Sequence, residues 1–357
     1  MKNEKFVNNE NDNETLQEEI DDSSEELFEH HRILVDGGQS MMRLDKYLST
    51  HIEGTSRNKI QQAAKAELIK VNERPQSSNY KIKPHDLIQI YLPREPYEQD
   101  IIPQNIPLDI VYEDDDIIVI NKNASMVVHP AFGNWDGTLL NALAFHFEGQ
   151  KDNNGNEIMP LLVHRIDKDT TGLLVVTKNE PAQFFLSQQF AEHLCNRTYT
   201  ALVWGNLKED EGTIEGNVGR NLKDRKRMDV FSDGSHGKRA ITHWKVLKRF
   251  NYVTLVECKL ETGRTHQIRV HFKSIGHPLF NDETYGGDQI LKGLTTNKYR
   301  QFIINCFHIL PRQALHATTL GFIHPTTFEK VFFSSNLPND MQEIINKWDK
   351  FVNIDLL

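Results

Sequence analysis

A short polar stretch, His164–Gly172, carries side chains that can do chemistry, and the apolar run Leu173–Thr177 follows it directly. The apolar run predicts a buried strand, and the polar stretch predicts a turn that presents its side chains beside that strand. Asp167 lies between Arg165 and Lys168, and neighbouring positive charge favours an ionised carboxyl group. We therefore expect Asp167 to act as a nucleophile or an electrostatic partner rather than as a general acid. A structural Asp that caps the turn is the alternative.

Length and composition are those of a globular protein with room for two domains: 357 residues, 38% hydrophobic and 25% charged. No apolar run reaches the length of a membrane span, and the N-terminus lacks the basic-then-apolar order of a signal peptide. The cysteines Cys195, Cys258 and Cys306 are isolated and form neither a disulfide framework nor a CxxC metal pair. These features predict a cytoplasmic protein with no membrane partner.

Charge is distributed unevenly along the chain. The net charge is −9, and residues 1–30, with two Lys and eleven Asp or Glu, account for all of it. We expect an acidic, disordered tail over residues 1–38, with order beginning near His31–Val35, because so few apolar side chains cannot offset the entropy of ordering. An inert, solvated tail is favoured over an acidic arm that mimics nucleic acid and competes for a basic surface.

A small basic domain is expected over residues 39–93, where the segment from Arg43 to Pro93 has nine Lys or Arg and five Asp or Glu. Two helical patterns, a Val-Asn turn and a late strand follow one another here. This order resembles the S4 RNA-binding module, which implies phosphate contacts from one helical face. A basic α/β module with a solvated face is the alternative. The implied RNA-binding residues are Arg43, Lys46, Arg57 and Lys59.

A Pro-rich linker is expected over residues 94–107, followed by a larger domain at residues 108–357. In this larger domain, strand-like runs outnumber helical ones and come in adjacent pairs. The pattern predicts an α+β domain with a mixed, largely antiparallel sheet. The segment from Arg220 to Arg239, with seven Lys or Arg and three Asp, is predicted to be a basic loop.

Three separate segments carry the remaining ionisable and aromatic candidates: His164–Leu174, Arg197–Ala201 and Gly263–Arg269. In order and wording they resemble the motifs His-Arg-Leu-Asp-x-x-Thr-Ser-Gly-Leu-Leu, Lys/Arg-x-Tyr-x-Ala and Gly-Arg-x-His-Gln-Ile-Arg of the RluA-type pseudouridine synthases. A later His-Pro…Asp…Tyr-Gly pattern matches His277–Gly286. The likeness extends over most of the chain after the tail, and the S4-plus-synthase order is most similar to the RluD-like branch, which modifies large-subunit rRNA.

The resemblance implies a pseudouridine-synthase fold and an isomerase that breaks the C1′–N1 bond of uridine and rejoins the base through C5. Asp167 would be the nucleophile or the base at C2′, and Arg264 would pair with it and hold it charged. Tyr199 would stack on the uracil and help move the C5 proton; a core tyrosine is the alternative. Arg165 would fill the space of the flipped uridine, and His164 would form a structural hydrogen bond.

The partner that the resemblance implies is RNA, namely 23S-type large-subunit rRNA or its precursor particle, with no obligate protein partner. The basic loop would bind phosphates together with the S4-like domain. The reaction needs no cofactor and no metal, and the sequence has no HExxH, P-loop or GxGxxG pattern. The candidate phosphate-binding residues of the loop are Arg225, Lys226, Arg227 and Lys238.

Two departures from the family pattern concern loops. Asn123 and Ser125 stand where the family has Pro and Gly, and Asn281 stands where it has Gly. We expect these departures to affect loop geometry more than activity.

Two rival functions remain open at this point. One is a catalytically silent, S4-containing RNA-binding protein. The other is a carboxylate-based glycosidase, for which Asp169 is the one close candidate for the proton donor. We expect Asp169 to support the turn instead.

Overall fold

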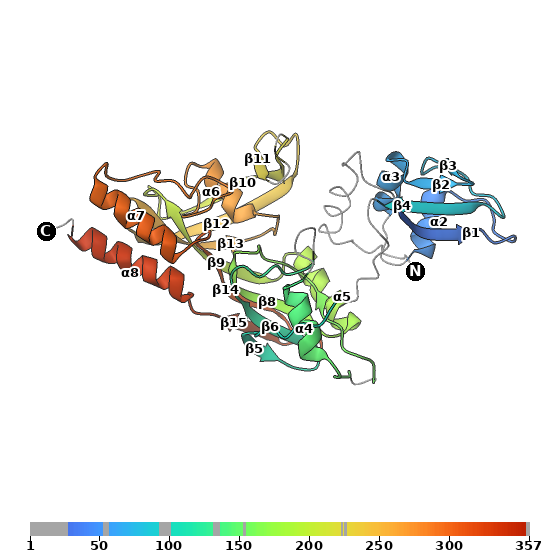
Figure 1. The fold of residues 1–357 in the computed structure, drawn as a ribbon, viewed down its shortest axis with the longest axis horizontal. Helices are drawn as coiled ribbons and strands as arrows, with labels where there is room; N and C mark the ends of the chain where they lie inside the picture. Colours follow the sequence, from blue (N-terminus) through green and yellow to red (C-terminus); the bar gives the residue numbers. More distant parts are fainter. Residues whose placement is uncertain are drawn as a thin grey trace. The chain divides into compact units, whose positions relative to one another are not determined.

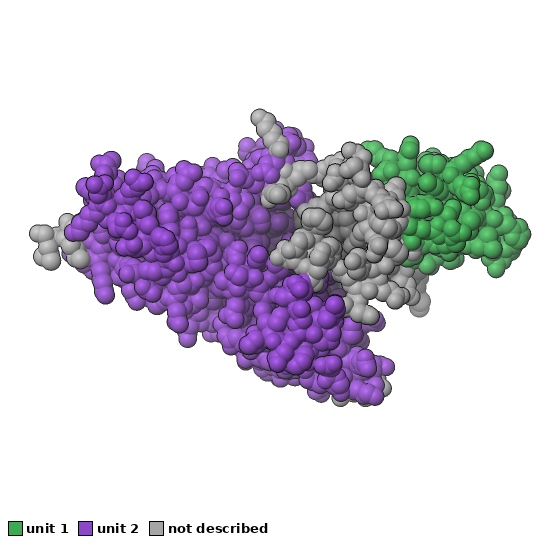
Figure 2. All heavy atoms as spheres, in the orientation of Figure 1, with its two compact units in different colours: residues 1–100 green, residues 101–357 purple. Residues whose placement is uncertain are grey.

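The computed structural model describes residues 28–52, 57–92, 101–130, 136–152, 155–222, 224 and 227–354. The chain forms two compact units, residues 1–100 and 101–357, and each is described by itself (Figures 1 and 2). No helix within the described ranges is long and apolar enough to span a membrane.

The small unit is an antiparallel sheet of four strands in the order β1-β4-β2-β3, with two helices. Its core is apolar and includes Leu44 and Leu48 from the first helix and Ile60 from the second. Its elements are β1 (Phe28–Leu34), α2 (Leu44–His51), α3 (Arg57–Lys65), β2 (Ile69–Val71), β3 (Arg74–Pro75) and β4 (Leu87–Leu92).

Strand β1 lies within the range that the sequence assigned to the tail, so the tail boundary at residue 38 is too late. β1 pairs with β4 from Phe28↔Leu92 to Leu34↔Leu87. Glu29, one of the acidic residues of that range, accepts a hydrogen bond from Gln89 Nε2 at 2.7 Å. Main-chain pairing and this side-chain bond compensate for the low apolar content of the segment. Residues 1–27 and the expected linker residues 93–100 lie outside the described part of the chain.

The large unit is an eleven-stranded sheet in the order β11-β10-β12-β13-β9-β14-β8-β6-β5, with β15 paired to β14 and β7 paired to β8. Within the described ranges, β8 and β14 are the one parallel pair of this sheet, so the predicted mixed, largely antiparallel α+β architecture is confirmed. Its strands are β5 (Ile110–Glu113), β6 (Ile117–Lys122), β7 (Leu161–Leu162), β8 (Thr171–Thr177), β9 (Asn196–Trp204), β10 (Glu211–Arg220), β11 (Met228–Phe231), β12 (Lys238–Arg249), β13 (Val253–Leu260), β14 (Leu315–Ile323) and β15 (Lys330–Ser334).

Helices cover both faces of this sheet (Figure 1). On β8, Leu174 and Val176 join the core that α4 and α6 cover, whereas Leu173 and Val175 face the core that α5 covers. All seven residues of β8 are buried, as expected for a strand covered on both sides. The helices are α4 (Leu139–Phe147), α5 (Glu180–Ala191), α6 (Gln267–Ser274), α7 (Asn297–Ile309) and α8 (Asn339–Ile354).

Three elements of the large unit differ from the sequence-based expectation. The segment 220–239 was expected to be a loop, but β11 forms inside it and pairs with β10. The apolar residues Met228 and Val230, two positions apart, pack into a small core, and the many charges around them hid this alternation. The helices α7 and α8 were not predicted; they pack on each other and on β9 through a core that includes Trp348.

Gly172, at the end of the polar stretch, allows β8 and β14 to approach closely. It has φ +111°, and a Cβ there would lie 2.2 Å from the carbonyl oxygen of Ala317 on β14. Such a distance is far below a van der Waals contact, and the left-handed backbone favours glycine. The junction of β8 with β14 therefore requires glycine at this position.

We expect Gly172→Ala to lower the free energy of unfolding by about 1–2 kcal/mol from backbone strain and by about a further 1–3 kcal/mol from overlap with β14. Gly234, which also has a positive φ (+70°) but nothing within 4 Å of its Cβ position, offers the matched control. Gly234→Ala should show the strain contribution alone. Urea unfolding of both variants measures the difference, and equal losses would contradict the close approach.

Candidate active site

The polar turn between β7 and β8 carries the candidate carboxylate. The amide of Thr170 donates to the carbonyl of Asp167 at 3.1 Å, which closes the turn. The hydroxyl of Thr171 and the Nδ1 of His316 on β14 lie 2.9 Å apart in a buried hydrogen bond. The turn is therefore fixed to the first residues of two neighbouring strands.

A buried arginine, Arg269, joins Asp167 to a second carboxylate. Its Nη1 donates to Asp167 Oδ2 at 3.0 Å. Its Nε and Nη2 donate to the two oxygens of Asp282 at 2.7 and 2.9 Å. Arg269 lies in the first turn of α6, and Asp282 is completely buried. The bidentate bond to Asp282 sets the plane of the guanidinium, so that its remaining edge points at Asp167.

The charges around Asp167 favour its ionised form. Burial by itself raises the pKa of Asp167, but the positive charges of His266 and Arg269 and the hydrogen bond from Arg269 outweigh burial and hold this pKa below its usual value. Burial lowers the pKa of His266, so the permanent positive charge at neutral pH is that of Arg269. The expectation of an ionised Asp167 thus has a structural cause.

The expected partner of Asp167 was Arg264, and the structure corrects that pairing. Arg264 precedes α6, and its Nε donates to the carbonyl of Arg239 at 3.2 Å. Both arginines belong to the motif Gly263–Arg269, but α6 begins at Gln267. Only the arginine inside the helix is directed into the core beside the turn.

Tyr199 lies on β9 with an exposed fraction of 7%, within the core that α4 and α6 cover. Burial raises the pKa of Tyr199, and the negative charge of Asp167 adds to this increase. The phenol is therefore neutral at neutral pH, and it lies in the same electrostatic environment as Asp167. The side chain of Tyr199 is close enough to Asp167 for the carboxylate charge to affect the pKa of the phenol.

Tyr285 and His266 complete the polar network around Arg269, and the sequence analysis gave neither a role. His266 Nδ1 and the hydroxyl of Tyr285 lie 2.9 Å apart, and this hydroxyl accepts a hydrogen bond from the amide of Met228 at 3.0 Å. The guanidinium of Arg269 lies over the Tyr285 ring, 5.2 Å from its centre. The Tyr-Gly pattern in the sequence was a signal for Tyr285.

Lys122, at the end of β6, binds the main chain of the turn. The sequence analysis gave it no role. Its exposed fraction is 1%, and its Nζ donates to the carbonyls of Lys168, Asn123 and Met126 at 2.8–2.9 Å. Burial lowers its pKa to about 7, and the carboxylate of Asp169 opposes that decrease. Lys122 comes two residues after the apolar run Ile117–Ile120 in the sequence, and this position was the available signal. A lysine at the end of a buried strand needs hydrogen-bond partners nearby.

Two residues of the turn have the structural roles that we expected. The amide of Val175 donates to His164 Nε2 at 3.1 Å, and the His164 ring stacks on Phe190. Burial lowers the pKa of His164 to about 3, so the ring is a neutral acceptor. Asp169 accepts hydrogen bonds from the amide and hydroxyl of Ser125 at 3.2 and 3.3 Å.

The two glycine replacements both fall at positive φ, with Ser125 at +62° and Asn281 at +58°. Each new side chain forms hydrogen bonds: Ser125 binds Asp169, and the Asn281 amide donates to the carbonyls of Phe307 and Leu310. These bonds compensate for the strain of a left-handed side chain, so the loops keep the conformation for which glycine is favoured.

The predicted RNA-binding residues have varied surroundings. Arg165 and Lys46 are exposed. Arg43 and Arg57 are about half exposed, and both bind the buried carboxylate of Asp45. Arg227 pairs with Asp224, and Lys238 is exposed at the start of β12. The side chains of Lys59, Arg225 and Lys226 lie outside the described residues.

One group in the described ranges has the composition of a metal site. Asp114, Asp116 and His324 each place a ligand atom within 4.8 Å of the others. These atoms already bind protein groups: His324 Nε2 and Asp114 Oδ2 lie 2.8 Å apart, and Asn179 donates to Asp116 at 2.9 Å. We assign the cluster a structural role.

The buried Lys122 generates a prediction about stability. From pH 7 to the ordinary lysine pKa of 10.5, the unfolded chain binds a proton that the folded chain has lost, so the free energy of unfolding should rise with pH. Relative to Lys122→Met, the wild type should gain up to about 1.4 kcal/mol per pH unit. Denaturant unfolding between pH 7 and 9 measures this, with the exposed Lys330→Met as control. Equal slopes for wild type and Lys122→Met would contradict the lowered pKa of Lys122.

Comparison with known proteins agrees with this geometry. Residues 116–274 match the family model for RNA pseudouridylate synthase, and residues 42–88 match the S4 domain. An uncharacterized RNA pseudouridine synthase of Chlorobaculum parvum is 45% identical over 311 residues, which are 87% of this chain and 94% of that protein. The ribosomal large subunit pseudouridine synthase D of Zymomonas mobilis is 42% identical over 304 residues, 84% of this chain and 92% of that protein.

A solved structure also resembles the fold. Human RNA Pseudouridylate Synthase Domain Containing 4 superposes with a TM-score of 0.52 at 20% identity, over 67% of this chain and 92% of that one. The matched S4 domain and the relatives that align over nearly their whole length establish the relationship. The chain therefore belongs to the RNA pseudouridine synthases, which are isomerases that act on RNA.

Proposed function

We propose that this enzyme converts uridines of large-subunit rRNA to pseudouridine, in free rRNA or in its precursor particle, with Asp167 as the catalytic carboxylate. The observation that carries the proposal is the partly buried ion pair with Arg269, which orients Asp167 and keeps it ionised. The rRNA substrate is supported by relatives that are named ribosomal large subunit pseudouridine synthase D.

The chemistry requires a carboxylate next to the ribose and the base. The C1′–N1 bond breaks, the uracil turns, and a C1′–C5 bond forms; the proton lost from C5 is balanced by the proton gained at N1. Asp167 either attacks C1′ or removes the C2′ proton, and both roles need the ionised form. Tyr199, whose pKa is raised by burial so that the phenol stays neutral, would stack on the uracil and help move the C5 proton. The reaction is redox-neutral, so the proposal includes no cofactor.

Access to the carboxylate requires the uridine to leave its stack, which costs a few kcal/mol. Arg165 is exposed and lies two residues before Asp167, so it is placed to fill the space of the flipped nucleotide. Basic side chains of the S4 domain and of the segment before β11 would neutralise RNA phosphates. A cytoplasmic location accords with an rRNA substrate.

A catalytically silent RNA-binding protein is the less favoured alternative. A silent scaffold would have no need for a buried carboxylate that is held ionised, because a buried charge is unfavourable unless it is paired. Here Arg269 pairs with the fully buried Asp282 and with Asp167, whose side chain is 19% exposed.

We expect Asp167→Asn to lower the rate of pseudouridine formation by at least about 10²-fold, because the amide cannot act as a base or a nucleophile. Asp169→Asn is the matched control, and it should remain within about tenfold of wild type since Asp169 supports the turn. Carbodiimide treatment of rRNA followed by primer extension measures the product. Full activity of Asp167→Asn would show that the assigned residue is wrong, and inactivation by Asp169→Asn would favour a two-carboxylate mechanism.

The corrected ion pair predicts a ranking of two arginine variants. Arg269→Lys keeps the charge but cannot bind Asp167 and Asp282 with planar geometry, so kcat should fall by about 10²-fold. Arg264→Lys should lose less than about tenfold. Single-turnover rates and thermal unfolding of both variants separate loss of function from loss of fold. A larger rate loss for Arg264→Lys than for Arg269→Lys would favour Arg264 as the partner of Asp167, as the sequence analysis expected.

A further inference from the structure

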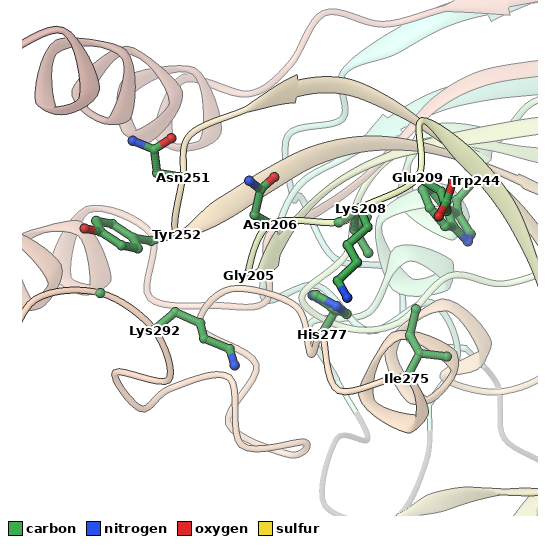
Figure 3. A pocket seen from close by; sticks show the side chains of 12 residues that line it. Gly205, Asn206, Lys208, Glu209, Trp244, Asn251, Tyr252, Ile275, His277 and Lys292 are labelled. Carbon is green, nitrogen blue, oxygen red and sulfur yellow. The ribbon is translucent and has the colours of Figure 1, made fainter. Parts of the chain in front are cut away.

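A pocket of about 630 Å³ lies on the large unit (Figure 3). None of its lining residues belongs to the turn that carries Asp167. The loop after β9, the turn between β12 and β13, the end of α6 and the loop near residue 292 contribute to it. Its wall includes the apolar side chains of Leu207, Tyr252 and Ile275. Nothing in the proposed reaction uses this pocket.

Two elements lead from the active site to this pocket. Helix α6 begins beside His266 and Arg269, and Ile275, just after its last residue, lines the pocket. At a rise of about 1.5 Å per residue, the separation along the helix is about 14 Å. Strand β9 likewise runs from Tyr199 to the pocket residue Gly205, which is about 20 Å at a strand rise of about 3.3 Å per residue. RNA bound at Asp167 can thus reach the pocket within a few nucleotides.

Two lysines from different loops, Lys208 and Lys292, line the pocket. Lys208 and Lys292 are exposed, and Figure 3 shows both side chains extending toward the side where His277 lies. A Cβ at Gly205 would lie 2.8 Å from the His277 ring and 3.8 Å from Cε of Lys292, so these two side chains flank the same glycine. The pocket carries one acidic side chain, Glu209, against these two cations.

His277 offers a fixed hydrogen-bonding atom to the pocket. Its Nδ1 lies 2.6 Å from the carbonyl of Trp204, so Nδ1 carries a proton and Nε2 of the neutral ring is an acceptor. A ribose 2′-hydroxyl can donate to such an acceptor, and this hydroxyl distinguishes RNA from DNA. The C-terminal end of α6 is unfavourable for an anion, which places the phosphate at the lysines rather than next to Ile275.

We propose that this pocket binds a nucleotide of the RNA substrate that flanks the target uridine. Its phosphate lies between Lys208 and Lys292, its ribose hydroxyl contacts His277, and its base packs on the apolar wall. This inference rests on the proposed function, since it assigns a second RNA contact to the same enzyme.

The test compares the wild type with the double variant Lys208→Gln/Lys292→Gln. Lys330→Gln/Lys350→Gln, which removes two exposed lysines from β15 and α8, is the matched control. Binding to in vitro transcribed large-subunit rRNA is measured over a range of salt concentrations, together with kcat and KM for pseudouridine formation. Binding of uridine 5′-monophosphate is followed by saturation-transfer NMR.

We expect the pocket variant to bind rRNA about tenfold more weakly, with a salt slope smaller by about 0.7–0.9, as for one phosphate that is no longer neutralised. KM should rise by a similar factor, and kcat should stay within twofold. Unchanged rRNA affinity and slope, or changes equal to those of the control variant, would overturn the inference. So would loss of uridine 5′-monophosphate binding with unchanged rRNA binding, which would identify a site for free nucleotides.

The failure of this inference can be distinguished from failure of the proposed function. If the wild type makes no pseudouridine in rRNA, the proposed substrate is wrong, whereas the affinity and salt slope still report on the pocket. If the wild type is active and the pocket variant keeps both KM and affinity, the pocket inference alone fails.

Discussion

The site depends on a single buried cation shared by two carboxylates. Removing Arg269, Asp167 and Asp282 from water is costly, and the attraction between them compensates only when geometry is close to ideal. The bidentate bond to Asp282 supplies that geometry from within 13 residues of Arg269. Asp167, more than 100 residues away in the sequence, receives the remaining guanidinium edge. The position and the charge of Asp167 therefore have one cause.

The sheet provides the rigidity that this ion pair needs. Gly172 lets β8 approach β14, and Lys122 binds three carbonyls around the turn. On another side, Arg312 donates to the carbonyl of Asp169 and forms a bidentate pair with Asp340 at the start of α8. Gly172, Lys122 and Arg312 therefore fix the main chain of the turn. The proposed reaction uses none of these three residues, and the Asp167 side chain remains available.

The sequence predicted the order of the two units, most strands and a polar turn with Asp167 beside a buried strand, because each of these depends on local pattern. The catalytic role of Asp167 rests on the motif resemblance and stays a prediction. The sequence could not rank Arg264 against Arg269, since both lie in one motif and only the start of α6 decides which side chain is turned inward. Helix α8 was not predicted, and its link to the turn is indirect: Asp340 at its start binds Arg312, which in turn donates to the Asp169 carbonyl. Strand β11 was not predicted for a similar reason. Its apolar residues Met228 and Val230 pack in a cluster with Tyr285, which is distant in the sequence.

Tyr285 connects the ion pair of Arg269 to strand β11. Its ring lies under Arg269, and its hydroxyl binds His266 and the first amide of β11. The hydroxyl of Tyr285 accepts the proton of the Met228 amide and also shares a hydrogen bond with His266 Nδ1. A shift of β11 must therefore either carry Tyr285 with it or leave a buried amide without an acceptor, which costs about 1–3 kcal/mol. The basic segment before β11 and the environment of Asp167 are thus mechanically linked through one phenol.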